Sequence, residues 1–258
     1  MAGERRLPVV FVPGGVLPAE LSYGKLLPEL GDQVDFVLKD LEVYAGDVPP
    51  ADYELGLEAE AIEQAADDAG FDTFHLVGYS GGGASALVFT AGYPDRVRSL
   101  ALVEPAWIGN EGWTTDEAAY WQKIALLMTL QPDERMEGFA RLNTGSGKVI
   151  PRLGPQPDWM AKRPAGLEAM TRAFERSFLD VESLRNFHRP VYVAVGGLSH
   201  PAERDKAERL SSVFPDIQVE VYQDRHHMDP PQRAEAARFA RALHELWRRA
   251  GWHQAGIG

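Results

Sequence analysis

Short apolar runs of strand length alternate with amphipathic, helix-like stretches along most of this 258-residue chain. The runs at residues 74–77 and 191–195 are almost continuously apolar, which is typical of strands buried on both faces of a sheet. Strand–helix alternation predicts an α/β fold, with a mostly parallel central sheet flanked by helices on both faces. The predicted strands are residues 9–12, 34–38, 74–77, 99–103, 191–195 and 217–222. The predicted helices are residues 20–30, 56–69, 82–92, 202–214 and 231–249.

The alternation breaks from residue 107 to residue 186, where a helical pattern at 117–130 is followed by Gly- and Pro-rich segments at 145–147 and 151–155. An insertion that leaves the carboxyl end of a strand lies over that end, where such sheets bind ligands. We therefore predict a helical cap, residues 107–186, on a core formed by residues 1–106 and 187–258. The aromatic candidates for a substrate pocket are Tyr79, Trp107, Trp113, Trp121 and Trp159. The alternative is that these aromatic side chains only pack onto the core.

Charge and composition exclude several classes of function. The formal net charge is −12 and no basic stripe is present, so nucleic-acid binding is not expected. The chain has no cysteine, which excludes disulfides, thiolate catalysis and cysteine-ligated metals. No apolar run approaches the length of a membrane span, and the first apolar run, at residues 7–12, is too short for a signal-peptide core. We expect a cytoplasmic protein without membrane partners; the sequence does not indicate its oligomeric state.

The segment from Gly78 to Gly82 contains the pattern G-x-S-x-G between a predicted strand and a predicted helix, with Ser80 at its centre. The serine of such a turn is held so tightly that the residues two before and two after it must lack side chains. The turn exposes the hydroxyl and places the N–H of Gly81 at a helix N-terminus, where it can stabilise an oxyanion. A glycine-rich turn with an incidental serine is the alternative. A phosphate-binding loop is disfavoured because neither G-x-G-x-x-G nor G-K-S/T is present.

With this motif the chain resembles the α/β-hydrolase family over nearly its whole length. The segment from Val9 to Gly15 resembles the family's first strand and turn, which supply the other oxyanion donor. Many members have His-Gly where this chain has Pro13 and Gly14. The resemblance implies that the N–H of Gly15 is this donor, with Val16 as the less favoured alternative.

The family pattern also implies a catalytic histidine after the last strand, where this chain has His226 and His227. An imidazole there can accept the serine proton and return it to the leaving group. Related sequences place an apolar residue after the catalytic histidine, and Met228 therefore favours His227. A metal site at the two histidines is disfavoured, since neighbours on a loop point apart, and no other metal-ligand spacing occurs. No cofactor is expected.

The acid departs from the family pattern. Ser199 stands where an aspartate usually follows the second-last strand, and a serine cannot stabilise an imidazolium as a carboxylate does. Glu104, at the end of the strand after the nucleophile helix, is the replacement, because some hydrolases of this fold carry their acid there. A buried carboxylate in that position needs a partner. Glu104 in a salt bridge to the cap is the alternative, and Glu203 and Asp205 are weaker candidates for the acid.

These residues predict a serine hydrolase that cleaves an apolar carboxylic ester or lactone, using Ser80, His227 and Glu104. Glu104 and the loop from Gly196 to Ser199 are similar to those of the lactonases that open zearalenone. Two alternatives stay open: a cofactor-free lyase or C–C bond hydrolase on the same scaffold, and a non-catalytic ligand-binding protein.

Overall fold

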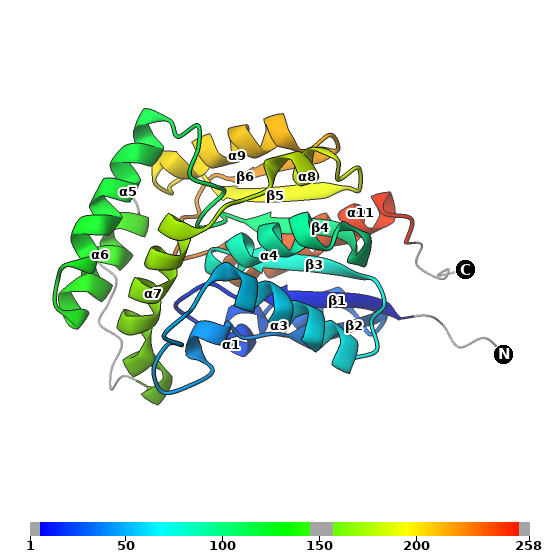
Figure 1. Ribbon diagram of the computed structural model, residues 1–258. Helices are drawn as coiled ribbons and strands as arrows, with labels where there is room; N and C mark the ends of the chain where they lie inside the picture. Colours follow the sequence, from blue (N-terminus) through cyan, green and yellow to red (C-terminus); the bar gives the residue numbers. More distant parts are fainter. Residues whose placement is uncertain (1–5, 145–156, 253–258) are drawn as a thin grey trace.

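The computed structural model describes residues 6–144 and 157–252, which fold around a six-stranded parallel sheet (Figure 1). The strand order is β2-β1-β3-β4-β5-β6, and every neighbouring pair is parallel. All six predicted strands are present and the predicted α/β architecture is confirmed. The strands are β1 (Leu7–Val12), β2 (Val34–Leu38), β3 (Phe74–Tyr79), β4 (Val97–Val103), β5 (Val191–Gly196) and β6 (Ile217–Tyr222).

Side-chain alternation along the strands builds a separate apolar core on each face of the sheet. In β1, Val10 and Val12 join the core on one face, whereas Val9 and Phe11 join the core on the other. The first core is covered by α3 (Leu55–Asp68), α4 (Gly81–Gly92) and α9 (Pro201–Val213). The second is covered by α1 (Ala19–Tyr23), α2 (Leu27–Leu30) and α11 (Ala236–Arg249), with the short α10 (Pro231–Ala234) before it.

The prediction of one helix over residues 20–30 is wrong, because the chain forms two short helices there. The N–H of Gly24 bonds to the carbonyl of Glu20 at the end of α1. Pro28 then occupies the first turn of α2, where a residue needs no N–H donor. In the interior of one long helix the same proline would remove a hydrogen bond and clash with the preceding turn. Gly24 and Pro28 therefore separate the two helices.

In the described part of the stretch between β4 and β5, the α-helices are α5 (Thr115–Met128), α6 (Pro132–Asn143), α7 (Arg163–Arg176) and α8 (Val181–Arg185), with a 3-10 helix, η3 (Asp158–Lys162), before α7. Helices α5, α6 and α7 lie beyond the carboxyl ends of the strands, at the left of Figure 1. Helix α8, although inside the predicted cap, packs against α4 on the face of the sheet. The Gly- and Pro-rich segments at 145–147 and 151–155 lie outside the described residues.

The start of α5 is fixed by its own sequence. The Thr114 hydroxyl accepts a hydrogen bond from the N–H of Glu117, and the Glu117 carboxylate accepts one from the N–H of Thr114. This reciprocal cap satisfies two donors that a helix N-terminus leaves open. Within residues 6–144 and 157–252, no helix combines the length and the apolar composition needed to cross a membrane.

Candidate active site

Ser80 lies on a strained turn between β3 and α4. Its φ of 52° and ψ of −115° put it in a conformation that non-glycine residues rarely adopt. A Cβ atom on Gly78 would lie 2.5 Å from the carbonyl oxygen of Gly82 and 2.8 Å from the Cα of Gly83. A Cβ on Gly82 would likewise lie 2.4 Å from the Pro13 carbonyl oxygen, so the close approach around Ser80 requires that the residues two before and two after it lack side chains, as the motif predicts.

The loop after β6 brings the His227 ring to this turn. Its Nε2 lies 2.9 Å from the Ser80 Oγ, and the His227 side chain is almost fully buried. The Tyr79 hydroxyl donates to the His227 carbonyl oxygen, which ties the loop to the end of β3. His227, the second of the two adjacent histidines, is thus the one in contact with the serine.

Glu104 completes the chain of contacts from the end of β4. Its Oε2 lies 2.9 Å from His227 Nδ1, and its Oε1 accepts a 2.7 Å hydrogen bond from the N–H of Gly196. A carboxylate only accepts hydrogen bonds, so Nδ1 carries the proton and Nε2 is free to accept one from Ser80. Like Ser80, Glu104 has a positive φ, here 41°.

Burial alone would raise the pKa of Glu104, but its neighbours lower it below the usual value. The largest opposing effects are the hydrogen bond and the charge of His227, followed by the Ser199 hydroxyl and the Gly196 N–H. The Ser199 hydroxyl lies close to the carboxylate, although its geometry falls short of a regular hydrogen bond. Ser199, which stands where the family usually has an aspartate, therefore lies beside the Glu104 carboxylate.

The weaker acid candidates on α9 have other partners. Asp205 accepts a hydrogen bond from the Thr114 hydroxyl, and Glu203 pairs with Lys206.

The backbone of Gly15 meets that of Gly81 beside the serine. A Cβ on Gly81 would lie 3.6 Å from the Gly15 nitrogen, so the two predicted oxyanion donors are close together. The same Cβ would lie 3.1 Å from the Met170 Sδ, and a Cβ on Gly15 would overlap the Met170 Cε. Met170, from α7, therefore covers both glycines. The Tyr44 hydroxyl donates a 2.6 Å hydrogen bond to the Gly15 carbonyl and fixes this turn from outside.

The aromatic residues predicted to line a pocket have other contacts. Trp107 is 1% exposed, stacks on Phe174 and donates from Nε1 to Asn110, so it is a packing residue between core and cap. Tyr79 is buried and uses its hydroxyl on the backbone of the histidine loop. Trp113 stacks on Trp121, and Trp159 lies against the Arg163 guanidinium. Tyr79 is the exception: besides its hydrogen bond, its ring lies 5.3 Å from the His227 ring, whereas these tryptophan contacts involve none of Ser80, His227 and Glu104.

Within the described part of the chain, one group of side chains has the spacing of metal ligands: Glu104, Glu203 and His227 each place one ligand atom within 4.8 Å of the others. The Lys206 ammonium lies 2.8 Å from the Glu203 carboxylate and would repel a cation there. His227 already uses both ring nitrogens within the site. These contacts favour a hydrogen-bonded triad over a metal centre.

Sequence reasoning missed Tyr44, Met170, Arg163 and Lys206. Each acts through a contact between distant segments, such as η1 (Glu42–Tyr44) with the turn after β1, and carries no motif of its own. Glu203 was predicted only as a weaker candidate for the acid, because an acidic residue in the first turn of a helix is usual and needs no further role. Its burial beside the triad was not visible in the sequence.

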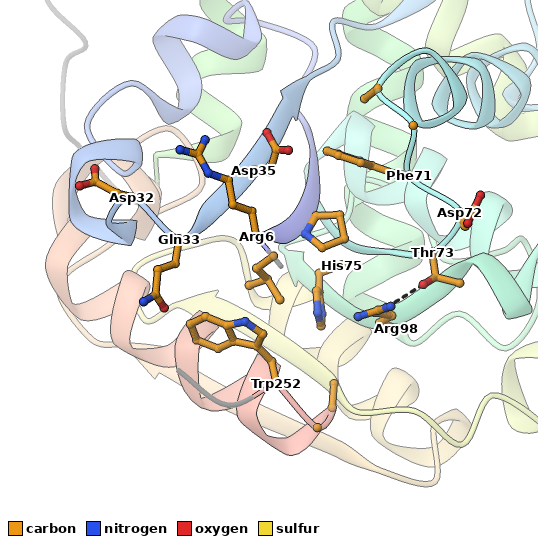
Figure 2. A pocket seen from close by; sticks show the side chains of 16 residues that line it. Arg6, Asp32, Gln33, Asp35, Phe71, Asp72, Thr73, His75, Arg98 and Trp252 are labelled. Carbon is orange, nitrogen blue, oxygen red and sulfur yellow. Dashed lines mark hydrogen bonds between the residues drawn. The ribbon is translucent and has the colours of Figure 1, made fainter. Parts of the chain in front are cut away.

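A separate cavity of about 1090 Å³ lies at the opposite end of the sheet (Figure 2). It is lined by the first residues of β1 and β3, among them Leu7 and His75, together with Arg98 and Trp252. His75 Nδ1 lies 2.7 Å from the Ser99 hydroxyl, and burial lowers the pKa of His75 to about 3. The triad contributes nothing to this cavity.

The family model for the alpha/beta hydrolase fold matches residues 8–234, and the chain belongs to this family. Its relatives include bacterial hydrolases, and it spans less than half the length of two of them, both from Comamonas testosteroni. It is 33% identical over 114 residues to the 2-hydroxy-6-oxo-6-phenylhexa-2,4-dienoate hydrolase of Comamonas testosteroni. That match covers 42% of this chain and 39% of the relative.

A second relative matches over most of its length. The N-formylmaleamate deformylase of Pseudomonas putida is 26% identical over 230 residues, which is 86% of this chain and 82% of the relative. Among solved structures, an esterase from Thermogutta terrifontis superimposes with a TM-score of 0.72 at 19% identity, covering 95% of this chain and 90% of the other. This last likeness shows the fold.

The close approach at Ser80 can be tested through the glycines. We expect Gly78→Ala to lower the free energy of unfolding by about 1–3 kcal/mol, because its Cβ meets backbone atoms that cannot move aside. Gly92→Ala is the control: no atom lies within 4 Å of its Cβ, and alanine favours the helix. Urea denaturation of both variants measures the difference. Equal stability of the two would contradict this explanation of the glycine spacing.

Proposed function

We propose that this protein is a serine hydrolase that cleaves a carboxylic ester or lactone through an acyl-enzyme. One observation carries the proposal: the unbroken chain of contacts from Ser80 Oγ to His227 Nε2 and from His227 Nδ1 to Glu104 Oε2, each 2.9 Å long. This is the geometry of a nucleophile, a general base and the carboxylate that orients it. Membership of the family supports the same chemistry.

In this mechanism the Ser80 oxygen attacks the substrate carbonyl while His227 Nε2 accepts the hydroxyl proton. The N–H groups of Gly15 and Gly81 hold the oxyanion of the tetrahedral intermediate. Glu104, ionised because of its low pKa, stabilises the imidazolium. The imidazolium then gives its proton to the leaving oxygen, and the carbonyl stays bonded to Ser80. Water next attacks this acyl-enzyme while His227 accepts a water proton, and His227 returns that proton to the Ser80 oxygen as the acid product leaves.

The neighbours of the two oxyanion donors support an apolar acyl group. Leu167 and Met170 of α7 lie over Gly15, and Leu41 and Met170 lie over Gly81. These side chains offer no charge or hydrogen-bond donor to the acyl portion of a substrate. A lactone is one such substrate, as the similarity of the Glu104 and Ser199 loops to zearalenone lactonases implies.

The nucleophile is tested by covalent labelling. We expect a fluorophosphonate probe to label Ser80 in the wild type and not in Ser80→Ala, which should also lose at least about 10⁴-fold in kcat/KM on p-nitrophenyl esters. Ser99→Ala, which removes a buried hydroxyl at the other end of β4, is the control and should keep its labelling. Labelling that persists in folded Ser80→Ala would exclude this nucleophile.

The acid is tested by Glu104→Gln, which keeps the size of the side chain. The Gly196 N–H requires the amide oxygen at the Oε1 position, so the NH₂ group faces His227 Nδ1. That group donates, which favours the tautomer with the proton on Nε2 and blocks proton transfer from Ser80. We expect kcat to fall about 10⁴-fold on the same esters. A loss of less than tenfold would show that another group orients the imidazole.

One observation favours a second candidate, the hydrolysis of an anionic substrate, including C–C bond cleavage. The Arg163 guanidinium is buried 3.8 Å from the Tyr44 ring centre, and its Nε has no hydrogen-bond partner. Among the described residues, no carboxylate lies within ion-pair distance of it. A buried cation without an anion is unfavourable, so a substrate carboxylate would be held there. The Comamonas relatives are named for dienoate and dioate-type acids, which carry such a group.

Arg163→Met separates the two candidates. If Arg163 binds a substrate carboxylate, kcat/KM for the p-nitrophenyl hemiester of glutarate should fall roughly 10- to 100-fold, whereas that for neutral p-nitrophenyl butyrate should change little. Arg172→Met removes an exposed charge from the same helix and serves as the control. Equal losses on both esters would assign Arg163 a structural role only.

A further inference from the structure

An ion pair between Glu203 and Lys206 is buried beside the triad. Both residues lie in the first two turns of α9, and their exposed fractions are 2% and 3%. The Lys206 Nζ lies 2.9 Å and 2.8 Å from the two carboxylate oxygens of Glu203. Most acidic residues at a helix N-terminus face water, so this burial needs a reason.

Stability alone does not supply that reason. Removing two charges from water costs more than their attraction usually returns, and apolar replacements of buried ion pairs are often as stable or more so. A retained buried pair therefore indicates a role in fixing a particular arrangement. The contacts on either side of the pair identify which one.

Lys206 holds the backbone that follows the catalytic carboxylate. Its Nζ donates to the carbonyl of Pro105 at 2.6 Å and to that of Ala106 at 3.4 Å. The N–H of Ala106 in turn donates a 2.8 Å hydrogen bond to the carbonyl of Ser80. One ammonium group thus fixes the segment that joins the strained Glu104 to the strained Ser80.

Glu203 places a second negative charge near the imidazole. One of its oxygens lies within 4.8 Å of a His227 ring nitrogen and of a Glu104 oxygen. Burial raises the pKa of Glu203; the charge of Lys206 opposes this shift, and that of Glu104 adds to it. The Lys206 ammonium, within 2.9 Å of both carboxylate oxygens, favours the charged form of Glu203, and a negative charge there favours a positive charge on His227.

We infer that the Glu203–Lys206 pair positions the triad: Lys206 anchors the backbone between Glu104 and Ser80, and Glu203 favours the protonated form of His227. This inference rests on the proposed function for its meaning in catalysis. Both residues act through other groups, and neither contacts the Ser80 hydroxyl in the structure. Other titratable or charged groups also lie around His227. Glu104 follows β4 and Tyr79 ends β3, and both contact His227 directly. Tyr120 of α5 faces Lys206, and Arg233 of α10 acts on Tyr79. The loop of His227 itself adds Arg225, His226 and Asp229.

The test is the titration of the His227 ring, followed by NMR in the wild type and in Glu203→Gln. An ionised carboxylate at this distance stabilises the imidazolium, and Lys206 offsets part of the effect, so its loss should lower the titration midpoint by about 0.5–1 pH unit. Glu117→Gln is the matched control, because Glu117 is also a buried, ion-paired carboxylate of the cap contact, with Arg209 as its partner. It should leave the midpoint unchanged.

The variant Glu203→Asp keeps the charge but withdraws it by one methylene, and should shift the midpoint in the same direction by less. It serves as the test if Glu203→Gln does not fold. A folded Glu203→Gln, or failing that Glu203→Asp, with the wild-type midpoint overturns the charge role of Glu203.

The anchoring role is tested with the double variant Glu203→Gln/Lys206→Met, which leaves no unpaired charge buried. Its rate of inactivation by the fluorophosphonate, at the best pH of each protein, should fall at least about tenfold below that of Glu203→Gln alone, because the 104–106 backbone loses its anchor. Equal rates would overturn this role. If the wild type itself does not react with the probe, the proposed function fails, whereas the His227 titration still decides the electrostatic part of the inference.

Discussion

A carboxylate can stay ionised in a protein interior only where hydrogen bonds and opposite charge replace water, and Glu104 is 2% exposed. Its two oxygens are used by His227 and by the Gly196 N–H, which come from the loop after β6 and from the end of β5. Because the strands are parallel, their carboxyl ends meet at one edge of the sheet. The position of this one charge therefore fixes how β4, β5 and the histidine loop come together around Ser80.

Backbone strain at the site is supported by the same sheet. Ser80 and Glu104 are the non-glycine residues with positive φ in the described part of the chain, and such conformations cost roughly 1–3 kcal/mol each. The N–H of Ser80 bonds to Val103, and that of Glu104 bonds to Ala194, both in neighbouring strands. These ladder bonds continue the regular pairing up to the strained residues, so the turns cannot relax without breaking the edge of the sheet.

The sequence predicted what local pattern controls: six strands from their apolar runs and the turn at Ser80 from its glycines. The expectation for Glu104 used its place at a strand end together with the resemblance to hydrolases that carry their acid there. Sequence reasoning failed where contacts between distant segments decide the outcome. It also failed at one local feature: Gly24 and Pro28 split the helix predicted over 20–30, although the apolar pattern runs through both positions. Trp107 looked like a pocket residue but packs between core and cap. Composition alone does not distinguish an aromatic that faces a ligand from one that fills a core.

Helix α7 and the turns that carry Gly15 and Gly81 form one packed unit. Met170 of α7 covers Gly15 and Gly81, while Tyr44 bonds the Gly15 carbonyl and lies under Arg163 from the first turn of α7. A Cβ on Gly166 would overlap the Tyr44 ring, so α7 approaches that ring as closely as a glycine permits. Any shift of α7 that admits a substrate must therefore move the side chains packed on the Gly15 turn. Under the proposed function, substrate selection by α7 and stabilisation of the oxyanion are for this reason physically coupled.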